Sequence, residues 1–166
     1  MKRLLTILIC GLLAFTACQK RGMQLFRGDY SFKTSGSITA KRANVFDPAE
    51  FHITLDNEIG QLQIASLDRK NDSLVVVMNY LNGEVVVTHA YCEGQNITFK
   101  DFKHNSLRVS IDGNIDVLCE VNVKAVGTMY DDNTMILNMT YDGEAGVGNL
   151  KYDLYGDDIK MVATRN

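Results

Sequence analysis

The stretch Asp116–Met129 reads DVLCEVNVKAVGTM and contains the clearest structural signal in this 166-residue chain. Small and medium apolar residues occupy every second position from Val117 to Ala125, through Cys119, Val121 and Val123. Glu120, Asn122 and Lys124 lie between them. Such alternation is typical of a β-strand with one buried and one solvated face. We therefore predict a strand whose apolar side faces the core.

The same period of two continues on both sides of this stretch, from Phe51 to the end of the chain. Alternating segments are separated by turn residues at intervals of about eight to twelve positions. Asn82-Gly83 is the strongest hairpin signal and favours a type I′ turn, because both residues accept a positive φ. Other turns are predicted at Asn57–Gly60, Asp68–Asp72, Glu93-Gly94, Lys103–Asn105, Asp112-Gly113, Asp131–Asn133 and Gly156–Asp158, and the Gly-rich stretch Gly143–Gly148 predicts a mobile loop or a bulge. No window sustains helical apolar spacing over three turns, so we expect no long helix.

This pattern predicts an all-β domain of about ten short strands over residues 28–166, connected as an antiparallel meander. A sheet of that length must curl or split to bury its apolar face and protect its edges. We expect it to close into an up-and-down barrel, with a two-sheet β-sandwich as the alternative. The domain is large enough to bury a core without disulfides or metals.

The first residues predict the destination of the chain. Lys2 and Arg3 precede an apolar run from Leu4 to Phe15, which is typical of a secretory signal peptide. The run is shorter than the roughly 20 residues needed to span a bilayer. We assign residues 1–17 to the signal peptide and residues 18–27 to a tether.

Phe15-Thr16-Ala17-Cys18 resembles the lipobox of bacterial lipoproteins, although that family usually has Leu where this chain has Phe15. The resemblance implies that Cys18 is acylated with palmitate-type chains and becomes the first mature residue. The alternative is a soluble secretory protein with Cys18 near the cut by chance. Several acyl chains would anchor the protein firmly, because each buried CH₂ contributes about 0.8 kcal/mol.

The residues after Cys18 favour a particular membrane and face. Gln19 replaces the Asp that, by the same resemblance, retains lipoproteins in the inner membrane, so we expect the outer membrane of the cell envelope. Lys20 and Arg21 stand where acidic residues direct some lipoproteins to the cell surface. The periplasmic face is therefore favoured, with the surface face as the alternative.

Gly28-x-Tyr30 resembles the Gly-x-aromatic opening of lipocalin-like proteins. As a whole, the chain is similar to the small envelope lipoproteins of gut Gram-negative bacteria that have lipocalin-like folds and no assigned activity. This resemblance implies the same barrel that the alternation predicts.

Charge and cysteines narrow the classes of function. Loss of Lys2 and Arg3 with the signal peptide changes the formal net charge from −3 to about −5. Because no basic patch remains, we expect no nucleic-acid partner. Cys92 and Cys119 leave three alternatives: a disulfide that closes a loop of about 27 residues and contributes roughly 3.5 kcal/mol, two inert thiols, or a reactive thiol.

No motif for catalysis, metal binding or cofactor binding is present, so we expect no enzyme, no metal and no cofactor. His52, His89 and His104 lie in separate segments without a second ligand at metal spacing, and we interpret each as exposed or partly buried. Asp72-Ser73-Leu74 resembles the O-glycosylation acceptor of some gut anaerobes. This makes Ser73 a candidate acceptor, with an ordinary turn residue as the alternative.

Two hypotheses for function remain. The first is a module that binds a small apolar ligand inside the barrel. The predicted core faces would line this site with Met78, Met129, Met135, Met139, Met161, Phe99, Tyr80 and Tyr152. The second is a structural or protein-interaction lipoprotein, in which the same side chains fill a core. The membrane is a partner through the lipid anchor in both.

Overall fold

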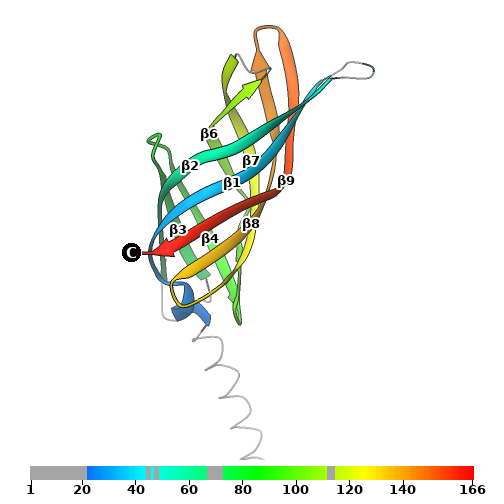
Figure 1. Ribbon diagram of the computed structural model, residues 1–166. Helices are drawn as coiled ribbons and strands as arrows, with labels where there is room; N and C mark the ends of the chain where they lie inside the picture. The colour runs from blue at the N-terminus through cyan, green and yellow to red at the C-terminus, as the bar shows by residue number, and fades with distance from the viewer. Residues whose placement is uncertain (1–21, 44–45, 47–48, 67–72, 112–114) are drawn as a thin grey trace, which may run out of the picture.

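The computed structural model describes residues 22–166, except 44–45, 47–48, 67–72 and 112–114 (Figure 1). Its nine strands are β1 (Gly28–Arg42), β2 (Glu50–Ser66), β3 (Ser73–Tyr80), β4 (Val85–Glu93), β5 (Asn96–Phe99), β6 (Phe102–Ile111), β7 (Ile115–Met129), β8 (Thr134–Val147) and β9 (Leu150–Arg165).

All neighbouring strands are antiparallel, in the order β5-β4-β3-β2-β1-β9-β8-β7-β6. A further pairing of β5 with β7 joins the two ends of this sheet. Eight strands therefore form a closed barrel, and β6 continues beside β7. The predicted all-β barrel is confirmed, and the sandwich alternative is wrong.

Several strands are longer than the sequence predicted. β2 runs without interruption through Asn57–Gly60, and β9 runs through Gly156–Asp158. These glycines serve close packing: a Cβ on Gly60 would lie 2.7 Å from the Phe32 ring, and one on Gly156 would lie 2.8 Å from the Ser37 carbonyl oxygen. The turns predicted at both places are wrong, because a glycine inside a strand also marks a close approach.

The turn predicted at Lys103–Asn105 is wrong, and the loop or bulge predicted at Gly143–Gly148 is a regular strand as far as Val147. β6 passes through the first segment with a bulge after His104. β8 includes Gly143, because only a glycine allows the close contact with the Glu120 carbonyl oxygen there. The chain turns later, at Gly148, which has a φ of 60°.

Other predicted turns are confirmed. Gly94 has a φ of 62° in the tight turn between β4 and β5. Asp131 accepts hydrogen bonds from the Asn133 and Thr134 amides between β7 and β8. The hairpin at Asn82-Gly83 exists, but its loop has three residues, 81–83, in place of a two-residue type I′ turn. The turns predicted at Asp68–Asp72 and Asp112-Gly113 lie outside the described residues.

The inward faces of the strands form one hydrophobic core. The alternating residues of β7 that predicted this core, Val117 through Ala125, are all buried. The methionines expected there are buried as well, apart from Met129, which is partly buried.

A short helix over residues 22–26 covers the base of the barrel (Figure 1). Phe26 is fully buried and its carbonyl oxygen accepts a hydrogen bond from the Tyr30 hydroxyl at 2.9 Å. Arg165 lies over the Tyr30 ring and donates to the Leu25 carbonyl oxygen. The predicted tether through Arg27 missed this helix, because one helical turn has no periodic signal and depends on tertiary contacts. In the described part of the chain, no helix has the length and apolarity to cross a membrane.

The β3–β4 hairpin ends part of the way up the barrel, whereas its neighbours continue (Figure 1). Register pairing of β2 with β3 ends at Gly60, opposite Tyr80. One further bond runs from the Leu81 amide to the Ile59 carbonyl oxygen at 2.9 Å, and β2 beyond it pairs with β1. The tip of the hairpin therefore lies where the backbone pairing between β2 and β3 ends.

Candidate binding site at the barrel seam

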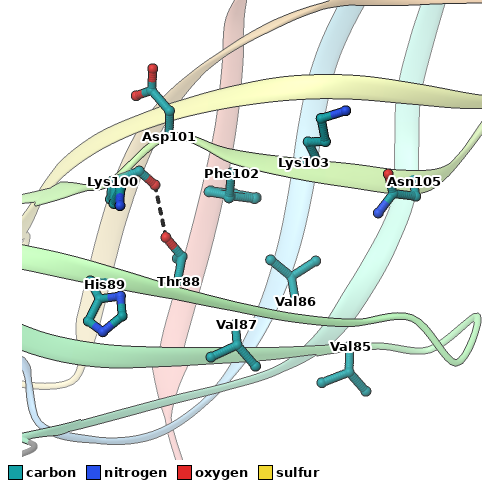
Figure 2. A pocket seen from close by; sticks show the side chains of 10 residues that line it. All are labelled: Val85, Val86, Val87, Thr88, His89, Lys100, Asp101, Phe102, Lys103 and Asn105. Atoms are coloured by element: carbon teal, nitrogen blue, oxygen red, sulfur yellow. Dashed lines mark hydrogen bonds between the residues drawn. The ribbon is translucent and has the colours of Figure 1, made fainter.

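The backbone hydrogen bonding around the barrel is interrupted between β4 and β6. The ladder between β4 and β5 ends with a bond from the Lys100 amide to the His89 carbonyl oxygen at 2.8 Å. In a regular ladder the Lys100 carbonyl oxygen would accept from the His89 amide. It accepts instead from the Thr88 hydroxyl at 2.9 Å (Figure 2). The Thr88 hydroxyl thus takes the place of a backbone N–H donor at the point where β4 and β6 separate.

Beyond this point the two strands face each other without a ladder. Phe102 and His104 point inward like Val86, whereas Val85 and Val87 point outward. Opposite residues of a regular ladder share a face, so the register of β4 and β5 does not continue into β6. Within the described residues, no backbone hydrogen bond joins β4 to β6. We call this stretch, Val85–Val87 of β4 with residues 102–104 of β6, the seam.

Glu84 fixes the other end of the seam. Its carboxylate accepts hydrogen bonds from the Asn105 amide at 2.7 Å and from the Ser106 amide at 3.1 Å. The Ser106 hydroxyl also donates to it. These amides lie in the β6 bulge, where the regular ladder is interrupted. One carboxylate therefore satisfies donors that a neighbouring strand would otherwise pair.

A cavity of about 330 Å³ lies along the seam (Figure 2). Val86 and Phe102, which are core side chains only 7% and 8% exposed, lie between the two strands. Val85 and Val87 are 59% and 62% exposed on the outer face. The cavity therefore lies between the exposed valines of the outer face and buried side chains of the core. Its lining consists of Val85, Val86, Val87, Thr88, His89, Lys100, Asp101, Phe102, Lys103 and Asn105.

A buried ionic cluster adjoins this end of the seam. The His104 side chain lies between two carboxylates, with Nε2 2.5 Å from Glu58 Oε1 and Nδ1 2.5 Å from Glu84 Oε2. His104 is fully buried, and the two glutamate side chains are 12% and 11% exposed. An ionised carboxylate can only accept hydrogen bonds, so with both carboxylates ionised each ring nitrogen carries a proton. In that state the cluster is an imidazolium held by two anions.

Two tyrosines enclose this imidazolium. The Tyr80 ring stacks on His104 with 4.4 Å between centroids, and Tyr141 meets it edge-on at 6.4 Å. The Tyr141 hydroxyl donates to Glu58 at 3.1 Å. The buried Tyr80 hydroxyl has no hydrogen-bond partner among the described residues. Five side chains from different strands and turns thus converge on one point.

The charges in the cluster shift its protonation equilibria. Burial alone lowers the pKa of His104, but hydrogen bonds and charge from Glu58 and Glu84 outweigh it and raise that pKa. Burial alone raises the pKa of Glu84, but hydrogen bonds from Ser106, Asn105 and His104 lower it overall. Burial and the nearby carboxylates raise the pKa of both tyrosines. The cluster is most stable with His104 protonated and Glu84 ionised.

A second cavity, of about 150 Å³, opens beside the cluster. Glu58 and Tyr80 line it together with the hairpin tip, so the cluster borders a space outside the core. Its lining is Glu58, Ile59, Tyr80, Leu81, Asn82, Ser106 and Arg108.

The cluster limits what His104 can do. An imidazolium whose two protons are both held by carboxylates has no lone pair, so it is neither a general base nor a metal ligand. Among the described residues, no group of histidine, cysteine and carboxylate side chains is placed to hold a metal ion. The site therefore offers a cavity with a mixed polar and apolar lining, backbone groups of β4 that face it, and the ionic cluster at one end.

The structure separates Cys92 from Cys119. Cys92 faces Ile97, which faces Gly127 on β7. Cys119 lies eight residues further along β7, which is about 26 Å at ~3.3 Å per residue, whereas a disulfide needs Cα atoms within roughly 7 Å. Both are free thiols, so the disulfide alternative is wrong. Burial raises the pKa of each to about 11, which favours inert thiols over reactive ones.

The other predicted sites lie apart from the seam cavity. Ser73 is the half-buried first residue of β3, opposite Tyr91. Asp72 and Cys18 lie outside the described residues, so O-glycosylation and acylation stay predictions.

His104 was interpreted as exposed or partly buried, and that interpretation is wrong for this residue, although His52 and His89 are exposed. Sequence reasoning also missed Glu58 and Glu84. One signal was available: His104 occupies an inward position two residues after Phe102, where the alternation calls for an apolar side chain. A polar residue at such a position indicates a buried partner.

No family model matches this chain, and no curated protein matches it. Among solved structures, it is similar to a redesigned β-barrel, b11L5F_LGL, with 14% identity, a TM-score of 0.37, and coverage of 88% of this chain and 96% of that one. It is also similar to EF1p2_mFAP2b bound to DFHBI, with 11% identity, a TM-score of 0.42, and coverage of 89% and 99%. These low scores carry no argument about function.

Proposed function

We propose that this protein is a lipid-anchored binding module of the cell envelope that takes a small, mainly apolar ligand at the seam. One observation carries the proposal: a cavity of about 330 Å³ lies along two strands that do not pair with each other. Its lining combines Phe102 and three valines with polar groups, and concave sites of this kind are typical of small-molecule binding. Acylated Cys18 would hold the protein on the periplasmic face of the outer membrane. The proposal includes no catalytic step, metal or cofactor.

The anchor predicts a change of location on mutation. Cys18→Ala should leave the membrane fraction, because it removes the thiol that would carry the acyl chains. The matched control is Cys10→Ala, which removes the other cysteine of the leader and should stay in the membrane fraction. Membrane pellets washed with carbonate measure this directly. A Cys18→Ala protein that still pellets would contradict the lipoprotein assignment.

Ligand binding predicts extra mass on the native protein. Lipidated protein, purified from its own host in mild detergent and measured by native mass spectrometry, should carry a bound species that denaturation releases. Val86→Phe should lose this species, because the larger side chain fills the seam. Val162→Phe, on the exposed outer face of β9, is the matched control and should retain it.

Two results would refute the binding function. Either the wild-type protein carries no bound species, or the species stays bound to Val86→Phe while that variant remains folded.

A second candidate function is docking of another envelope protein. The outer face of β4 and the hairpin tip expose four large apolar side chains, Leu81, Val85, Val87 and Tyr91, with exposed fractions from 56% to 78%. Exposed apolar side chains that gather on one surface often mark a protein contact. In the mass measurement, a co-purifying protein in place of a small species would favour this candidate.

A further inference from the structure

We propose that the ligand of the seam is a short extended peptide segment, which pairs with the open edge of β4 as an added strand. This inference rests on the proposed binding function and names the chemical class of its ligand. The direction of the backbone groups on β4 supports it.

The hydrogen-bonding pattern of β4 sets which residues face the seam. The Tyr80 amide donates to the Glu84 carbonyl oxygen, so Tyr80 and Glu84 form a hydrogen-bonded pair of the β3–β4 ladder. Such pairs recur at every second residue. Val86 and Thr88 therefore bond to β3, whereas the N–H and C=O groups of Val85 and Val87 point toward the seam. The Lys100–His89 bond confirms this direction, because His89 has the same parity.

These four polar groups select the ligand. A purely apolar molecule in the cavity would cover them and leave them without partners, which costs binding free energy. A peptide in extended conformation supplies alternating donors and acceptors that pair with them. Its side chains would point alternately toward Val86 and Phe102 in the core and toward the exposed valines outside.

The ends of the seam limit the length of this segment. The Thr88–Lys100 bond closes one end, and the Glu84 contacts to the β6 bulge close the other. The five residue steps from Glu84 to His89 span about 16 Å at ~3.3 Å per residue. A segment of about four residues therefore fits, and a long strand that passes through does not.

The experiment compares two peptides on the full-length lipidated protein in detergent micelles, followed by NMR. The probe is acetyl-Thr-Val-Thr-Val-amide, and its control has the same sequence with N-methyl groups on alternate amides, which cannot form a ladder. We expect the probe to shift the amide signals of Val85, Val87 and Phe102, and the methylated peptide to bind about tenfold more weakly or not at all.

Variants of Val87 test the same edge from the protein side. Val87→Pro removes an N–H that faces the seam and leaves the β3 ladder intact, as an edge position allows. It should bind the probe about tenfold more weakly, whereas Val87→Thr keeps the N–H and should bind like wild type. If Val87→Pro fails to fold, the peptide pair on the wild-type protein still decides.

Equal binding of the two peptides, no binding of either, or full binding by folded Val87→Pro would overturn the proposal. These failures differ from failure of the binding function itself. If the species that co-purifies in native mass spectrometry fragments as a lipid, the strand proposal is wrong and the binding function stands. If nothing co-purifies and neither peptide binds, both are wrong.

Discussion

Replacement of His104 by alanine should lower the free energy of unfolding at neutral pH by roughly 3–5 kcal/mol, the usual cost of removing one partner from a buried ion pair. The variant leaves the Glu58 and Glu84 carboxylates, only 12% and 11% exposed, without their shared cation. It also removes the ring on which Tyr80 stacks. For a domain of this size the melting temperature should fall by roughly 10 °C.

The matched control is His89→Ala, which removes an exposed histidine that lies outside this cluster. Its melting temperature should stay close to that of the wild type. Thermal unfolding followed by circular dichroism measures both variants. Equal stability of His104→Ala and the wild type would show that the cluster does not stabilise the folded protein.

The same variant should change how stability depends on pH. The pKa of His104 is raised in the folded protein, so its stabilisation is fully present below the ordinary value of 6.5 and is lost as the pH rises. Between 6.5 and 9.0, where ordinary thiols begin to ionise, wild-type stability should decline while that of His104→Ala stays flat. The pKa of Glu84 is lowered, so its contribution is present above 4.5 and is lost as the pH falls below that value. A merely structural role for the ring would not produce the alkaline decline.

The fold followed from the sequence because alternation reports directly which face is buried. The residues from Val117 to Ala125 specify one inward face, and the structure buries all of those named. Strand ends were less predictable, since a glycine has two uses. Gly94 and Gly83 adopt positive φ angles in turns, whereas Gly60 lies inside a strand under the Phe32 ring.

The site was less predictable, for a related reason. Glu58 and His104 both lie in segments that were predicted as turns. A polar side chain at an inward position interrupts the apolar alternation, and the interruption looks like a turn. These two residues lie in strands because their side chains bind each other, although they are 46 positions apart in the sequence. Local periodicity contains no information about such a pair, and departures of this kind concentrate at functional or strained sites.

The wall of the barrel is open between β4 and β6, and amide hydrogen exchange tests this opening at single residues. The amides of Val86 and Thr88 bond to β3, opposite Met78 and Val76, whereas those of Val85 and Val87 face the seam. All four lie in one strand, so they share the same sequence context and the same global stability.

NMR of the ligand-free full-length protein in detergent micelles should therefore show alternation along β4. The amides of Val85 and Val87 should exchange about 100-fold faster than those of Val86 and Thr88, because only the second pair needs an opening of the structure to exchange. Uniformly slow exchange at all four amides would mean that β4 and β6 are paired, and would contradict both the seam and the function proposed for it.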